Sequence, residues 1–254
     1  MPGTLLAVII GLAMCQLGLY LTTVYLHRTL SHRAIKMSAP LVLVCRTLVW
    51  LLTGIEPRQW VAVHRKHHAF TDVEGDPHSP LLEGFASVEF TNAWLYRKVA
   101  NDPAAVARYA RDLPPDRWDR VLFDHGLLGI GIGWVLTFLG LGWKLALVVW
   151  GVHIVTYLLA NGAINAVGHT YGDRAFAGQA TNSQWLAWVV AGEGLHSNHH
   201  AAPTSARLAL SRGEVDPAWW FINGARKLRW LTIRHDDVHL TQKARASESA
   251  LVET

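Results

Sequence analysis

An uncharged apolar run over residues 4–26 constrains this chain more than any other feature of its sequence. At about 1.5 Å per residue, a helix of this length crosses the roughly 30 Å hydrocarbon core of a bilayer. No basic segment precedes the run and no small-residue cleavage site follows it, so we predict a retained membrane span rather than a secretory signal peptide. Charged residues make up 17% of the chain, against about a quarter in soluble domains, which also favours a membrane protein.

Further apolar runs complete the predicted membrane part. Residues 127–141 and 144–162 are both apolar, and the short turn between them predicts a transmembrane hairpin. Residues 39–54 form a shorter run with Arg46 near its centre. Because a charged side chain is costly in hydrocarbon, we predict that this run is an interfacial helix rather than a span.

Histidine is unusually frequent, with 14 in the chain, and most of them are clustered. The segments HRTLSH at 27–32, HRKHH at 64–68 and HSNHH at 196–200 form three histidine boxes. Spacings of three and four residues place the histidines of the last two boxes on one helical face each, whereas the five-residue spacing of the first box predicts two faces and a bend. Neutral imidazole is the commonest side-chain metal ligand, and this many imidazoles exceed the needs of one metal. We therefore predict two metal ions with four or five ligands each. The candidate ligands are His27, His32, His64, His67, His68, His196, His199 and His200.

The boxes also restrict the topology, because residues that share metals must lie on one side of the membrane. About three spans satisfy this restriction and leave the N-terminus on the opposite side. Basic residues accumulate on the box side, which the positive-inside rule makes the cytoplasm. Membrane topology therefore explains the formal charge of +4, and no nucleic-acid partner is expected. The basic residues are Arg28, Arg33, Lys36, Arg58, Arg65, Lys66, Arg97 and Lys98.

The predicted fold is all-α and integral to the membrane. It has about three transmembrane helices, interfacial helices and a cytoplasmic helical cap that carries a di-metal site. Residues 1–241 are expected to form a single domain, and residues 242–254 a disordered tail.

The three boxes, together with WVAVHRKHHAFTDVEGDPHSP at 60–80 and NAVGH at 165–169, resemble the membrane fatty-acyl desaturases of the stearoyl-CoA desaturase-like type. The resemblance covers about residues 15–235. It implies O2-dependent removal of two hydrogens from a long-chain acyl thioester or acyl lipid, with a cis double bond expected at the delta-9 position. It implies two iron ions as cofactors, His169 as a ninth ligand and Asn165 as the holder of a metal-bound water.

Other polar residues are expected to support the ligands. Glu193 lies one helical turn before the third box and is expected to fix the tautomer of a metal-binding imidazole, although a simple cap or turn role is an equal alternative. Asp76 and His78, next to the second box, are given similar supporting roles. His153, inside a predicted span, is expected to be structural. No role is assigned to His125, His235 and His239.

The resemblance also implies substrate contacts and partners. In the family, the helix before the first box forms one wall of an acyl tunnel, which places Gly11 and Cys15 at its closed end; ordinary helix packing is the alternative. Arg97 and Lys98 resemble a basic pair that meets coenzyme A phosphates, with lipid phosphates as the alternative. Trp60 is also expected to contact substrate. No cytochrome b5-like segment is apparent, so electrons are expected from a separate protein of the ferredoxin, rubredoxin or cytochrome b5 type, and membrane lipids surround the spans.

Two other functions compete with desaturation. A hydroxylase of the same histidine-box superfamily, acting on alkanes or carotenoids, would use the same ligands. A metal transporter would place its ligands inside the spans at mid-membrane. Nearly all histidines of this chain flank the predicted spans instead, which favours an enzyme.

Overall fold

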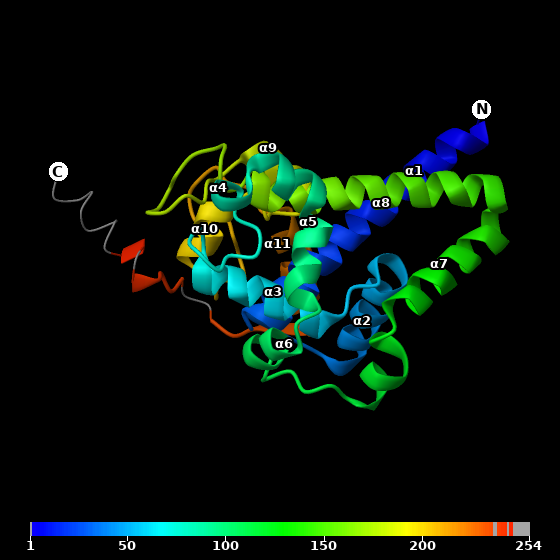
Figure 1. The fold of residues 1–254 in the computed structure, drawn as a ribbon, viewed down its shortest axis with the longest axis horizontal. Coiled ribbons are helices and arrows are strands. Elements are labelled where there is room, and N and C mark those ends of the chain that lie inside the picture. Colours follow the sequence, from blue (N-terminus) through cyan, green and yellow to red (C-terminus); the bar gives the residue numbers. More distant parts are fainter. Residues whose placement is uncertain (1, 236–237, 243, 246–254) are drawn as a thin grey trace.

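Helices form most of the protein in the computed structural model, which describes residues 2–235, 238–242 and 244–245 (Figure 1). The predicted all-α character is therefore confirmed, with one small sheet added. In chain order the elements are α1 (Pro2–Leu21), η1 (Thr22–Ser31), β1 (Ile35–Met37), α2 (Ala39–Thr53), α3 (Pro57–Phe70), α4 (Pro80–Glu83), α5 (Phe85–Ala100), α6 (Pro103–Tyr109), η2 (Asp119–Phe123), α7 (Gly126–Leu141), α8 (Trp143–Ala166), α9 (Gln184–Val189), α10 (His196–Ala201), α11 (Pro217–Lys227) and β2 (Leu231–Ile233).

Among the residues that the structure describes, two helices are long and apolar enough to cross a membrane. α1 and η1 together form one helix over Pro2–Ser31, and α8 has 24 residues. α7 is apolar but has only 16 residues, or about 24 Å at the usual helical rise, so its role as a third span stays a prediction. α2 and α3 pass the same test only as a pair bent by 86°, and the interfacial position predicted for α2 stays a prediction as well.

The long helices are held together by close backbone approach. α1 packs along α8, and a Cβ atom at Gly11 would lie 2.6 Å from the carbonyl oxygen of Val149. α7 packs against the end of α2 in the same way, since a Cβ atom at Gly129 would lie 2.3 Å from the carbonyl oxygen of Trp50. Such contacts suit helices in lipid, where small residues let backbones approach.

The arrangement has two distinct ends. Figure 1 shows the N-terminus and the turn between α7 and α8 at one end, and α4, α9 and α10 at the other. β1 and β2 pair in antiparallel fashion, with Lys36 opposite Thr232. This pairing brings the C-terminal segment back beside the end of η1. The tail predicted to be disordered, residues 242–254, lies outside the described residues except for 242, 244 and 245.

Candidate metal centre

Nine histidines converge in two adjacent groups whose ligand atoms lie within 4.8 Å of one another in each group. All nine were proposed as ligands from the sequence, and they come from η1 and its end, α3, the segment after α8, and α10. The first group is His27, His32, His64, His68 and His199. The second group is His67, His169, His196 and His200.

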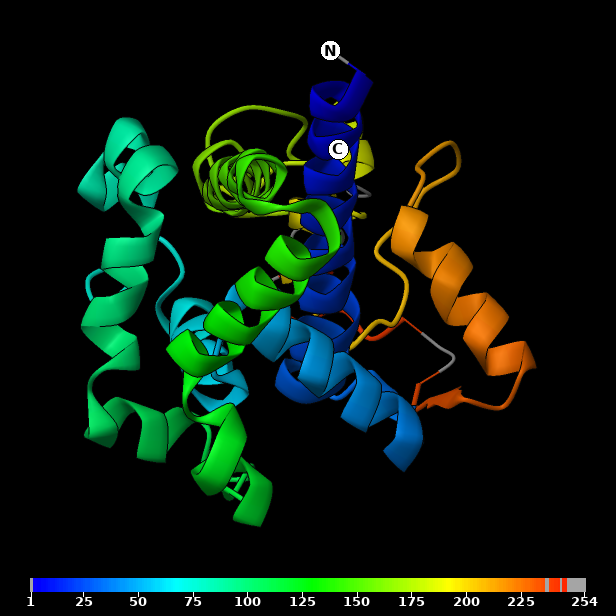
Figure 2. The same cartoon turned by 90° about the vertical axis from the view of Figure 1, so that its right-hand side faces the viewer.

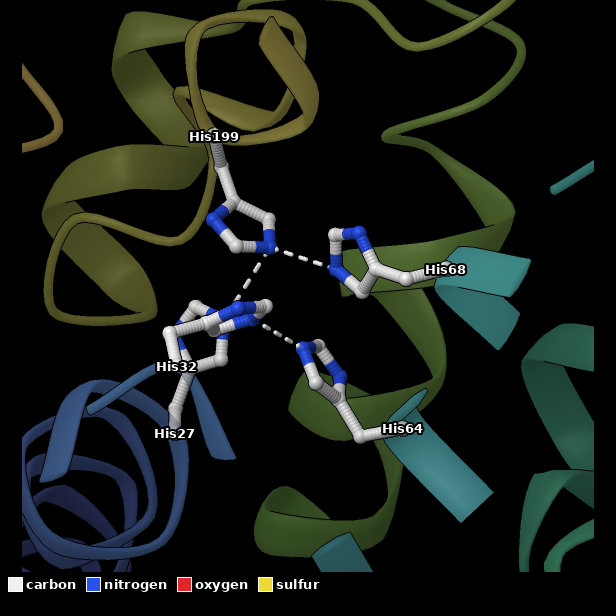
Figure 3. A group of neighbouring side chains, drawn as sticks. All are labelled: His27, His32, His64, His68 and His199. Atoms are coloured by element: carbon white, nitrogen blue, oxygen red, sulfur yellow. Dashed lines mark hydrogen bonds between the residues drawn. The ribbon is translucent and has the colours of Figure 1, made fainter. Parts of the chain in front are cut away.

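The first group is drawn together by its Nε2 atoms, as Figure 3 shows. The Nε2 atom of His199 lies 3.1 Å from that of His27 and 2.8 Å from that of His68. The Nε2 atoms of His32 and His64 are 2.8 Å apart. One nitrogen facing two others in this way cannot satisfy all of them by hydrogen bonding, whereas lone pairs that point at a common centre suit a metal ion.

The second group has the same character. The Nε2 atom of His196 lies 3.0 Å from that of His169 and 3.2 Å from that of His200. The Nε2 atom of His67 lies 3.3 Å from that of His200. His169, the residue suggested only by the NAVGH segment, therefore completes this group.

The second and third boxes each serve both groups. On α3, His64 and His68 are one helical turn apart and face the first group, while His67 faces the second. On α10, His199 belongs to the first group, and His196 and His200 belong to the second. The two groups are thus interleaved rather than each being built from whole boxes.

The first box corrects one detail of the sequence analysis. The five-residue spacing was expected to place His27 and His32 on different faces of an α-helix. η1 is instead a π-helix, whose hydrogen bonds join residues five apart, and the backbone N–H of His32 donates to the carbonyl oxygen of His27 at 3.0 Å. The wider turn places the two residues one above the other on the same face, and their rings meet edge to face with centroids 4.7 Å apart.

Three carboxylates accept hydrogen bonds from the far side of the ligand rings. Nδ1 of His27 lies 2.8 Å from Oε1 of Glu193, and Nδ1 of His67 lies 3.0 Å from both oxygens of Asp76. Nδ1 of His169 lies 2.8 Å from Oδ2 of Asp72. A carboxylate at Nδ1 keeps the proton there and leaves Nε2 free to bind metal.

Asp72 was missed by the sequence analysis. Its only signal is its place in the loop that also holds Asp76, and no spacing rule links it to His169, which lies 97 positions away. The loop fixes it, because Ser79 Oγ donates to Asp72 at 2.7 Å and the Asp72 N–H donates to Asp76 at 2.8 Å.

The electrostatics favour neutral ligands. Burial, reinforced by neighbouring imidazoles, holds the pKa of His196, His199 and His200 well below the ordinary value. Burial would raise the pKa of Asp76, but the hydrogen bond and charge of His67 outweigh it and lower that pKa to about 2. Clustered imidazoles oriented by carboxylates form a donor set that fits iron or another transition metal.

The remaining predicted residues near the site have varied positions. Asn165 lines the cavity described below, and its carbonyl oxygen accepts the N–H of His169. His78 is buried with its ring 4.8 Å from that of His67, and neither ring nitrogen has a partner among the described residues. His153 is buried in α8 and its Nε2 lies 2.8 Å from the carbonyl oxygen of Leu52. His235 and His239 lie away from both groups, with rings 5.5 Å from each other.

A cavity of about 890 Å³ adjoins the two groups. His27, His64 and His196 line one part of it, and α8 contributes residues from Trp150 to Asn165, a stretch of about 22 Å at the usual helical rise. The far part is apolar. Its lining includes Leu52, Ile130, Trp150, Ile154 and Leu158.

Some of the predicted substrate residues line this cavity and others do not. Trp60 lines it and also stacks on His64, with ring centroids 4.9 Å apart. Arg97 lines it, whereas Lys98 Nζ lies over the ring of Trp94 at 3.9 Å. Gly11 and Cys15 do not line it and lie in the contact between α1 and α8, the position that the alternative interpretation gave them.

A buried ion pair lies behind the first group and was also missed. Arg28, 1% exposed, binds Asp216 through two hydrogen bonds of 2.7 and 3.0 Å. Arg28 Nη2 also lies 3.9 Å from Glu193, which accepts a hydrogen bond from Thr23. Asp216 begins α11 by accepting the N–H of Trp219 at 3.3 Å, so the pair ties that helix to η1.

Comparison with known proteins agrees with this architecture. The family model for fatty acid desaturases matches residues 3–214. The Delta-9 acyl-lipid desaturase 2 of Arabidopsis thaliana is 34% identical over 215 residues, which are 81% of this chain and 66% of that protein. The sn-1 stearoyl-lipid 9-desaturase of Anabaena variabilis is 35% identical over 206 residues, 78% of this chain and 72% of that protein. The Acyl-CoA C20 Delta5-desaturase of Anemone leveillei is 31% identical over 210 residues, 81% of this chain and 66% of that protein.

The chain spans about two thirds of the length of these relatives. The matched region contains all nine histidines of the two groups and both long apolar helices, as expected for an integral membrane protein. The resemblance inferred from the histidine boxes is confirmed, and the chain belongs to the fatty acid desaturase family.

Proposed function

We propose that this protein is an O2-dependent fatty-acyl desaturase that introduces a cis double bond, at the delta-9 position, into a long-chain acyl thioester or acyl lipid. The observation that carries the proposal is the junction of the two histidine groups with a long, largely apolar cavity. A metal centre at the side of an apolar channel can act on a methylene group in mid-chain, which carries no polar handle of its own.

The two groups are proposed to hold two iron ions. Bound iron would activate O2, the oxidant that removal of hydrogen from an unactivated methylene requires. The protein's own contribution is orientation: Glu193, Asp76 and Asp72 hold the Nδ1 protons of three ligands, and Trp60 fixes the ring plane of His64 by stacking. Asn165 is proposed to hold a water beside the second group.

The cavity is proposed to position the chain and to exclude bulk water. Thr22 and Tyr157, whose hydroxyl oxygens are 2.7 Å apart, close its wall between η1 and α8. The apolar far part would hold the methyl end of the chain, and the ligand-lined part would hold the carbons that react. Fixing the chain between the two sets the distance from its head to the metals, and hence the double-bond position.

The orientation in the membrane is part of the proposal. The histidine groups are assigned to the cytoplasmic face and the N-terminus to the outside, which agrees with the place of α10, the helix of the third box, at the end away from the N-terminus (Figure 1). Electrons would come from a separate ferredoxin, rubredoxin or cytochrome b5-type protein on the cytoplasmic side.

Expression in a host that lacks the activity tests the function. Lipids from the host would be analysed for new double bonds and their position, and iron would be counted per purified chain. A new olefin with two irons per chain supports the proposal. An alcohol in place of an olefin would make the protein a hydroxylase, and metal flux in vesicles without either product would make it a transporter.

A further inference from the structure

The apolar lining of the cavity reaches the surface of α7 and α8. Four of its apolar lining residues are also exposed on the surface of these helices: Leu127 at 84%, Leu128 at 48%, Leu158 at 46% and Ile154 at 44%. Other lining residues, such as Val63 and Trp150, are buried at 2% and 3%. These four residues therefore join the cavity lining to an exposed apolar patch on α7 and α8, and such a patch suits contact with lipid.

α5, α7 and α8 all contribute to the cavity lining. α5 and α7 both pack against α8, and Figure 2 shows α5, in teal, at the left of the view and α7, in green, nearer its centre. The cavity is lined by α5 through Asn92, Tyr96 and Arg97, and by α7 from Gly126 to Ile130. The lining thus extends from α5 to α7 along α8.

The cavity lining also carries charges of both signs. Glu56 and Asp124 line the cavity together with Arg97, and none of the three belongs to an ion pair in the part of the chain that the structure describes. Burial, and then the negative charge of Asp124, raise the pKa of Glu56. A ligand that brings a cation to the carboxylates and an anion to Arg97 would satisfy both. Coenzyme A brings several phosphates and no cation, so the carboxylates would repel it.

Neutral polar atoms of the lining also lack partners. The Tyr96 hydroxyl and the Asn92 Oδ1 atom are buried and have no hydrogen-bond partner among the described residues. Burial raises the pKa of Tyr96, so its hydroxyl stays protonated and can donate a hydrogen bond. An ester carbonyl of a glycerolipid is an acceptor that suits this position.

From these observations, and resting on the proposed desaturase function, we propose that the substrate is the acyl chain of a zwitterionic glycerophospholipid. The chain enters sideways from the bilayer between α5 and α7. The headgroup phosphate pairs with Arg97, its ammonium group with Glu56 and Asp124, and an ester carbonyl accepts from Tyr96.

Photolabelling of the full-length protein in nanodiscs tests this proposal. Three probes would carry the same diazirine-bearing acyl chain: a phosphatidylcholine, a phosphatidylglycerol and a CoA thioester. Labelled peptides would be mapped at buried lining residues, Val63, Trp150 and Tyr157, because lipid around the protein reaches only the exposed ones. The phosphatidylcholine probe should label these positions at least about tenfold more than the CoA thioester, and more than the anionic lipid.

Two variants sharpen the test. The double variant Glu56→Gln/Asp124→Asn should reduce phosphatidylcholine labelling several-fold and raise CoA thioester labelling, whereas Glu83→Gln, an exposed acidic residue outside the cavity lining, should change neither. Equal or stronger labelling by the CoA thioester in the unaltered protein would overturn the lipid substrate, and equal labelling by the anionic lipid would overturn the zwitterionic headgroup.

The readout needs neither metal nor oxygen, so it is separate from the test of the reaction. Labelling without a new olefin in the expression host would leave the lipid site standing and remove the desaturase function. A new olefin with labelling only from the CoA thioester would support the desaturase function and overturn the lipid substrate.

Discussion

The Nδ1 atom of His27 lies 2.8 Å from Oε1 of Glu193, although 166 positions separate the two residues in the chain. The contact joins the first histidine box to the segment just before the third. It fixes the ring of a ligand that no other side-chain group orients at Nδ1 among the described hydrogen bonds.

Glu193→Gln should weaken metal binding in the first group. The amide can present its NH2 to His27 and no longer holds the Nδ1 proton by charge, and loss of such a partner typically costs about 10- to 100-fold in metal affinity. Iron titration of the purified protein measures this directly. Glu83→Gln is the matched control, and an unchanged iron affinity in Glu193→Gln would contradict the role given to Glu193.

Asp72→Asn should have a similar effect on the second group through His169. We expect a loss of affinity of the same order, about 10- to 100-fold, seen as less iron per chain at limiting iron. Glu74→Gln, an exposed acidic residue in the same loop, should retain full iron content. If Asp72→Asn also retained it, Asp72 would have only a structural role in its loop.

Gly129→Ala and Gly131→Ala should change the stability of the protein differently, although both residues lie on α7. A Cβ atom at Gly129 would lie 2.3 Å from the carbonyl oxygen of Trp50, while one at Gly131 would meet nothing within 4 Å. Overpacking should lower the stability of the first variant by about 1–3 kcal/mol, and better helix propensity should leave the second neutral or up to about 1 kcal/mol more stable. Thermal unfolding in detergent compares them, and equal midpoints would argue against the α2–α7 contact.

Arg28→Met should be strongly destabilising, because it leaves Asp216 buried without its cation. Breaking a buried pair from one side typically costs about 3–5 kcal/mol. Adding Asp216→Asn removes the stranded charge and keeps an oxygen to cap α11, so the double variant should be more stable than Arg28→Met alone. The opposite order in thermal unfolding would show that the pair is not coupled.

Ile130→Trp should shift the product profile toward shorter chains. Ile130 lines the far part of the cavity, and a larger ring would shorten the space for the methyl end, with about a tenfold loss of activity on the longest substrate. Cys15→Trp is the comparison, since Cys15 is 4% exposed and packs with Leu19 and Tyr157. A changed chain-length profile in Cys15→Trp but not in Ile130→Trp would show that the closed end of the tunnel lies at α1.

The sequence allowed the long apolar helices and the histidines of the three boxes to be predicted because both signals are local. Apolar runs mark α1, α7 and α8, and spacings of three and four residues mark the second and third boxes. The placing of His27 and His32 on one face could not be predicted, because it depends on a π-helix and the residue types of η1 do not indicate one. The roles of Asp72 and Asp216 could not be predicted for another reason. Their partners lie 97 and 188 positions away, and only the fold brings them together.

The cavity was predicted in outline but not in its boundaries. The family resemblance placed its closed end at Gly11 and Cys15 on α1. The lining instead includes Trp150 on α8 and Ile130 on α7. The bend of 86° between α2 and α3 brings the α2 end against α7 and so decides which helices enclose the apolar part.

The interleaving of the two histidine groups has a consequence for assembly. α3 and α10 each send side chains to both groups. An ion bound in either group therefore fixes both helices, which lowers the entropy cost of ordering the ligands of the other group. Loading should therefore be cooperative, with chains that hold a single ion scarce at half-saturation. Native mass spectrometry during iron titration would then show mainly empty and doubly loaded protein.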